Sequence, residues 1–119
     1  MIHTPLRALL ACGLALPALA DPAEIVATDL TRTGETWRAE VTIRHADTGW
    51  DDYADGWRVE DASGSILGTR TLLHPHVEEQ PFTRALGNIA IPDGLTQVQI
   101  RASTNTTGWA DTTVTVPLP

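Results

Sequence analysis

Residues 37–45 alternate apolar and polar side chains, and this pattern constrains the fold more than any other feature of the chain. The apolar side chains are those of Trp37, Ala39, Val41 and Ile43. A period of two is typical of a β-strand with one face in the core and the other in water. The segment therefore predicts a strand of a half-buried antiparallel sheet. The same phase places His45 at the edge of the core.

Six further segments carry strand signals and are separated by turn residues. They are residues 24–33, 57–60, 65–73, a segment that ends at 89–91, 96–103 and 112–118. Gly34, Asp61–Gly64 and Pro92–Gly94 mark short turns, because proline presets φ and glycine supplies a positive φ. Seven short strands in about 100 residues predict an all-β fold, a seven-stranded immunoglobulin-like or fibronectin-III-like β-sandwich.

The same alternation predicts which side chains face inward. Trp37 and Trp57 share the phase of buried strand positions, so both are expected in the core. The other inward-facing side chains are expected to be Val26, Thr28, Leu30, Val98, Ile100, Ala102, Val114 and Val116.

The first twenty residues, MIHTPLRALLACGLALPALA, are expected to be a cleaved signal peptide. Arg7 supplies the positive charge, residues 8–16 the apolar region, and Ala18-Leu19-Ala20 a small-x-small cleavage site. A lipoprotein cleavage box at Leu9–Cys12 is the alternative, but it leaves too short an apolar region between Arg7 and Cys12. We therefore predict one domain, residues 21–119, that is periplasmic or secreted and has no transmembrane segment after cleavage.

Composition restricts the partners of this domain. Residues 21–119 contain no cysteine, methionine or lysine, and loss of Arg7 takes the formal net charge from −7 to −8. Without cysteine the domain has no disulfide and relies on packing. Nucleic acid is not expected as a partner, because its phosphates require a basic face.

The connections between the expected strands are long at one end of the sandwich and short at the other. Consecutive antiparallel strands place residues 46–56, 74–83 and 104–111 at the same end, here called the loop pole. Binding in such sandwiches usually occurs where the long loops gather. All three histidines of residues 21–119 and most of the loop aromatic residues belong to this pole.

A metal site is the sharpest hypothesis for the loop pole. His45, His74 and His76, with a carboxylate from Asp47 or Glu78, would suit a tetrahedral zinc site or a tetragonal copper(II) site. Copper(I) is disfavoured because thiolate and thioether ligands are missing. In the alternative interpretation, His45 is hydrogen-bonded to Asp47 at the edge of the core, and His-Pro-His is a rigid loop.

The acidic loop that follows His45 raises a second metal hypothesis. Asp47, Asp51, Asp52 and Asp55 supply the oxygen ligands that calcium prefers, although their spacing does not match an EF-hand. The alternative is a solvated loop in which these aspartates form turns.

Loop aromatic side chains suggest recognition without a metal. Trp50, Tyr53 and Trp109, flanked by Asp51 and Asp52, could stack on a sugar ring or anchor a protein partner. The alternative is that these rings cover the end of the core. We find no nucleophile motif, and a domain of this size offers little room for a deep cleft, so we expect no enzyme. A hydrolase with paired carboxylates stays open.

Two stretches carry a resemblance to known proteins. HADTGWDDYADGW (residues 45–57) and LLHPHVEEQPFTR (residues 72–84) resemble motifs of an uncharacterised family of small exported bacterial proteins. The resemblance implies a β-sandwich outside the cytoplasm and brings no activity, ligand or catalytic residue.

The leading prediction is therefore an exported domain that binds a ligand at the loop pole, in its most concrete form a zinc or copper(II) ion. The alternative is a metal-free module that recognises a glycan or an envelope protein. A third possibility, a subunit of an envelope assembly, predicts an exposed and unpaired edge strand.

Overall fold

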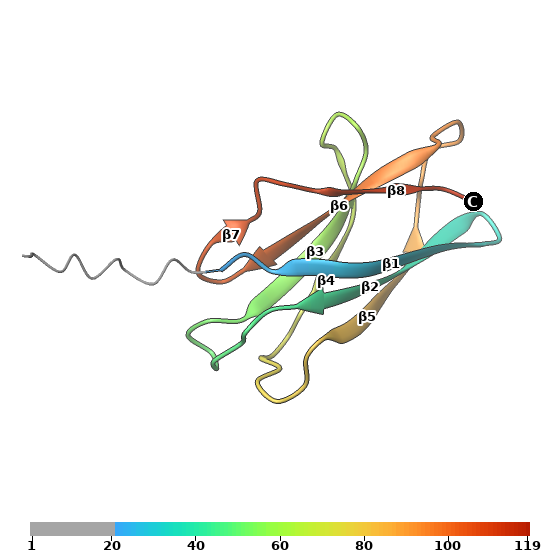
Figure 1. Ribbon diagram of the computed structural model, residues 1–119. Coiled ribbons are helices and arrows are strands. Elements are labelled where there is room, and N and C mark those ends of the chain that lie inside the picture. Colours follow the sequence, from blue (N-terminus) through green and yellow to red (C-terminus); the bar gives the residue numbers. More distant parts are fainter. Residues whose placement is uncertain (1–20) are drawn as a thin grey trace, which may run out of the picture.

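The computed structural model describes residues 21–119, which form two antiparallel sheets (Figure 1). The predicted signal peptide and Cys12 lie outside the described residues. The strands are β1 (Glu24–Thr33), β2 (Thr36–Arg44), β3 (Ala54–Glu60), β4 (Ile66–Thr71), β5 (Phe82–Ile89), β6 (Gln97–Thr104), β7 (Gly108–Trp109) and β8 (Val114–Pro117). Across these residues, no helix is long and apolar enough to span a membrane.

The strands divide into a sheet of three and a sheet of five. The first has the order β1-β2-β5, and the second has the order β4-β3-β6-β7, with β8 paired to β6 further along. The apolar face of β2 is buried, as its alternation predicted, and Trp57 and Val59 of β3 and Val98 and Ile100 of β6 are fully buried as well. The core therefore lies between the two sheets.

Two register shifts account for differences from the predicted faces. Val26 was expected inside but is 41% exposed, because the pairing of β1 with β2 shifts between Ile25 and Ala27 and turns Val26 outward. The fifth strand, of which only the end at residues 89–91 was predicted, is β5 and begins at Phe82. The pairing of β2 with β5 shifts near Gly87 and Asn88, and Asn88 has a φ of 56°. An extra residue in one strand changes which face the following residues occupy.

The structure contains eight strands where seven were expected, because β7 forms within residues 104–111, which were expected to be a loop, while the last predicted strand, residues 112–118, is β8. Ala110 donates its N–H to the Ala102 carbonyl (2.9 Å), and the next pairing on β6 is that of Val114 with Ile100. Residues 111–113 between them leave the sheet. Val114, expected in the core, is 38% exposed because β8 lies at the edge of its sheet.

Candidate functional site

The three long connections meet at one end of the sandwich. Leu72 donates its N–H to the Asp55 carbonyl (2.9 Å), and Asn105 donates its N–H to the Tyr53 carbonyl (3.1 Å). The Asn105 side chain also bonds the Trp50 carbonyl and the Tyr53 N–H, both at 2.9 Å. Residues 45–55, 72–81 and 104–107 are thus tied together by hydrogen bonds between their backbones and side chains.

Asp47 is the centre of this arrangement. Its side chain is fully buried. Oδ1 lies 2.7 Å from His45 Nδ1 and accepts the Ala54 N–H at 3.0 Å, and Oδ2 accepts the His76 N–H at 2.8 Å. A buried carboxylate is tolerated where its lone pairs are satisfied in this way. One side chain therefore joins the end of β2, the start of β3 and the connection between β4 and β5.

Gln80 reinforces the same joint. Its Oε1 accepts the His45 N–H (3.0 Å), and its Nε2 donates to the His76 carbonyl (2.9 Å). The first bond fastens the predicted loop to the end of β2, and the second joins two residues within the loop. Gln80 was not among the predicted site residues, because the partners of an amide in a loop depend on a contact 35 residues away.

His45 is engaged at both ring nitrogens. Nδ1 faces the Asp47 carboxylate at 2.7 Å, and Nε2 lies 2.9 Å from the Asp21 carbonyl. The predicted alternative, in which His45 is hydrogen-bonded to Asp47, is thus the observed arrangement. Both ring nitrogens of His45 are therefore directed at oxygen atoms of the protein.

His76 is buried within a stack of rings. Its ring lies 4.0 Å from that of Phe82 at an interplanar angle of 17°, and the His74 ring lies 4.5 Å away on an exposed loop. His76 Nε2 is 3.4 Å from Nη2 of Arg84. Burial lowers the pKa of His76, and the nearby Arg84 and His74 lower it further. His76 is therefore neutral at neutral pH, but its acceptor nitrogen is turned toward a guanidinium.

The predicted metal ligands are not gathered around one point. Among residues 21–119, no group of three or more histidine, cysteine, aspartate or glutamate side chains is arranged to hold a metal ion. Of the predicted ligands, His45 and Asp47 bond each other, His76 faces Arg84, and Glu78 is exposed. The aspartates of the calcium hypothesis are also divided, since Asp47 is buried at the joint and Asp51 is exposed.

Zinc, copper(II) and calcium are expected to leave the thermal midpoint of the exported protein unchanged within about 1 °C. A ligand at 100 times its Kd adds about 2.7 kcal/mol, which is a shift of several degrees in a domain of this size. Differential scanning calorimetry of the chelator-treated protein, with each ion added in turn, measures this. His74 does not belong to the joint. If zinc or copper(II) raised the thermal midpoint and replacement of His74 removed this increase, the result would support the histidine site.

The loop aromatic residues have a different environment. Trp50 keeps 66% of its surface exposed and packs edge-on against Tyr53, with ring centroids 5.6 Å apart. Trp109 of β7 is 38% exposed. Asp51 is exposed beside Trp50, and Asp52 lies half-buried, with Oδ1 accepting the Thr106 hydroxyl at 3.3 Å. The two tryptophans predicted in the core, Trp37 and Trp57, are buried.

Trp109 rests on the outer face of the five-stranded sheet. A Cβ placed on Gly56 would lie 3.5 Å from Cη2 of Trp109, so glycine in β3 leaves room for the ring. The Arg58 guanidinium carbon lies 4.2 Å from the Trp109 ring centroid, a cation–π distance. Arg58 Nε donates to Glu60, whose carboxylate is 2% exposed. Sequence patterns did not indicate these contacts, which depend on the register of β3, β6 and β7.

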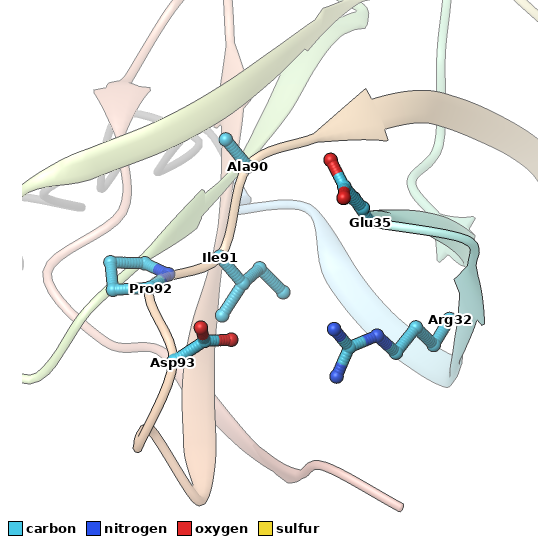
Figure 2. A pocket seen from close by; sticks show the side chains of 6 residues that line it. All are labelled: Arg32, Glu35, Ala90, Ile91, Pro92 and Asp93. Atoms are coloured by element: carbon cyan, nitrogen blue, oxygen red, sulfur yellow. The ribbon is translucent and has the colours of Figure 1, made fainter.

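A hollow of about 530 Å³ lies at the end of the sandwich opposite the loop pole, and Figure 2 shows the side chains that line it. Arg32, Glu35 and Asp93 line it beside two short turns. Arg32 is partly engaged, because its Nε donates to the Gly34 carbonyl at 3.0 Å. None of the predicted site residues lines this hollow, so it is separate from the loop pole.

Comparison with known proteins finds a relative from Halomicrobium mukohataei whose name is "Putative lipoprotein". It is 43% identical to this chain over 76 residues, which cover 64% of the chain and 37% of the relative. The chain thus spans little more than a third of that relative's length. No family model matches the chain, and no solved structure matches it.

Proposed function

We propose that residues 21–119 form an exported recognition domain that binds a glycan through Trp50, Tyr53 and Trp109. The observation that carries this proposal is the exposure of Trp50, a residue that keeps 66% of its surface in water. Its loop is nevertheless held in place, because Asn105 bonds the Trp50 carbonyl and the Asp47 joint ties the same loop to its neighbours. A large ring on a fixed loop binds a partner at a low cost in conformational entropy.

The polar groups around these rings favour a glycan over an apolar ligand. Sugars present C–H groups that stack on aromatic faces and hydroxyl groups that bond carboxylates, amides and hydroxyls. Asp51, which follows Trp50 in the chain, is exposed. Thr106, which donates its hydroxyl to the nearby Asp52, is exposed as well. A protein partner anchored by Trp50 is the alternative, since tryptophan is also the commonest centre of a protein interface.

The proposal extends to fold type and location. A sheet of three strands against a sheet of β4, β3, β6, β7 and β8 is compatible with an immunoglobulin-like or fibronectin-III-like sandwich. The signal-like residues 1–20 and the name of the relative both support a location in the cell envelope or outside the cell. We propose that cleavage occurs after Ala20 and gives a periplasmic or secreted domain, and that Cys12 does not carry a lipid.

The proposal is tested by titrating the exported protein with soluble cello-, chito- and manno-oligosaccharides and peptidoglycan fragments, using calorimetry and tryptophan fluorescence. Trp50→Ala is expected to weaken binding of the responding glycan by about 30-fold or more, as for the central aromatic residue of an interface. Ile66→Ala, which removes an exposed apolar side chain from β4, is the matched control and should leave the affinity unchanged.

Equal affinity of the Trp50→Ala variant and the unmodified protein would contradict this assignment. If no glycan binds but Trp50→Ala abolishes capture of an envelope protein, the protein alternative holds.

A further inference from the structure

A groove runs along the edge of the sandwich between residues 22–25 and 109–114, and we call it the edge groove. It consists of two hollows of about 310 and 350 Å³. Pro22, Ala110 and Thr112 line both hollows, so the two are continuous. Figure 1 shows the start of β1 beside β7 at this edge. The groove contains neither Trp50 nor Tyr53, but Trp109, one of the three aromatic residues of the glycan proposal, lines one of its two hollows.

The gap between β7 and β8 creates the edge groove. Residues 111–113 leave β6, and Ala102 of β6 becomes part of the lining, together with Ala23 and Ile25 of the facing segment. These side chains are small or aliphatic, so the groove has an apolar floor. Val114, at the start of β8, is 38% exposed beside it. An apolar floor of this kind is suited to the aliphatic side chains of an extended segment.

Free strand edges border the groove on both sides. Among the described strands, β1 pairs with β2 alone and β8 pairs with β6 alone. Every second N–H and C=O group along an edge strand points away from its own sheet and can bond an added strand. β1 is also the exposed edge that the envelope-assembly hypothesis requires.

The charge at the rim of the groove is negative. Glu24 and Asp111 line its two walls, and the lining contains no arginine. Arg44 pairs with Glu24 at the exposed rim (3.7 Å), and Arg101, which acts electrostatically on Asp111, is bound to Glu60 and to the Ala110 carbonyl. The whole chain also carries a formal charge of −7 and has no lysine. Complementarity therefore favours a basic occupant over a second copy of this acidic chain.

We propose that the edge groove binds an extended polypeptide segment of alternating aliphatic residues flanked by lysine or arginine, which adds as a strand to the edge of β8. Backbone hydrogen bonds supply part of the affinity in this mode, and pockets for alternate side chains supply the selectivity. The inference concerns a different ligand class and shares only Trp109 with the glycan proposal, so Trp50→Ala tests the glycan proposal and Asp111→Lys tests this one.

The test uses the exported protein and the labelled peptide Lys-Thr-Val-Thr-Val-Thr-Lys. Fluorescence anisotropy is expected to detect binding, at least tenfold weaker for the same peptide with glutamate at both ends. Asp111→Lys should weaken binding of the lysine peptide at least fivefold, whereas Asp93→Lys, an equally exposed change at the opposite end, should not. Hydrogen exchange should slow in residues 112–117 when the lysine peptide binds.

Three results would overturn the assignment. The first is no binding at millimolar peptide, or equal binding of both peptides. The second is protection confined to β4 or β5, which would place the peptide on another edge. The third is concentration-dependent dimerisation that Asp111→Lys abolishes, which would show that a second copy of the chain binds in the groove.

Discussion

Asp47→Asn is expected to lower the free energy of unfolding by about 3–5 kcal/mol. The carboxylate is fully buried and serves three partners, the His45 ring and the N–H groups of Ala54 and His76. An asparagine replaces one acceptor oxygen with an NH₂ group, which then faces a buried donor. A buried donor left without an acceptor costs about 1–3 kcal/mol. Urea unfolding followed by tryptophan fluorescence measures the change.

Asp51→Asn is the matched control for this substitution. It changes the same functional group in the same loop, but the Asp51 side chain is exposed. Exposed substitutions of this kind fall within about 0.5 kcal/mol of zero. If Asp47→Asn were also within that range, the joint would not hold the loops, and the rigid presentation of Trp50 would lose its physical basis.

Glu60→Gln is expected to destabilise the protein by about 2–3 kcal/mol, which lies below the full value for a buried ion pair. Glu60 accepts from Arg58 Nε and Arg101 Nε at 2.7 Å, and from Arg101 Nη2 at 3.1 Å. The two arginine side chains are 19% and 22% exposed, so water compensates part of the loss. The thermal midpoint should fall by roughly 10 °C, measured by calorimetry.

Glu40→Gln provides the comparison on the surface. Glu40 pairs with Arg38 on the outer face of β2, where both side chains are about half exposed. A surface ion pair of this kind contributes about 0–1 kcal/mol. If Glu60→Gln lowered the free energy of unfolding as little as Glu40→Gln does, this result would refute the view that Glu60 anchors the sheet.

The effect of Glu60→Gln should depend on pH in a defined direction. The hydrogen bond from Arg101 holds the pKa of Glu60 below its ordinary value of 4.5, despite the opposing effect of burial. A depressed carboxyl pKa stabilises the folded state above the unfolded value, and this stability is lost as pH falls through the folded value. The difference between the two proteins should therefore be constant near pH 7 and shrink below about pH 4.5.

The two buried carboxylates connect stability to the proposed binding surface. Asp47 holds the loop that carries Trp50, and Glu60 orients Arg58, on which Trp109 stacks. Both are therefore positioning residues for aromatic rings that they do not touch. Their replacement is expected to weaken glycan binding even under conditions in which the variant proteins stay folded.

The sequence by itself determined the strands and most of the core. Alternation in residues 37–43 and 96–103 marks inward side chains directly, because strand geometry sends successive residues to opposite faces. The positions of Gly34 and Pro92–Gly94 also located the short turns. These are local properties, so no contact between distant residues was needed to predict an all-β fold.

Only the tertiary structure decided the register and the partners of the polar groups. One extra residue turned Val26 outward. A short strand, β7, formed within residues 104–111, which the sequence predicted to be a loop. The sequence placed His45, Asp47 and His76 at one end of the sandwich. Whether they would surround a metal ion or bond one another depends on side-chain directions across 29 residues of chain separation. The contacts of Asp47 show that these residues bond one another. A buried carboxylate must be hydrogen-bonded, and its nearest partners here are backbone N–H groups and His45.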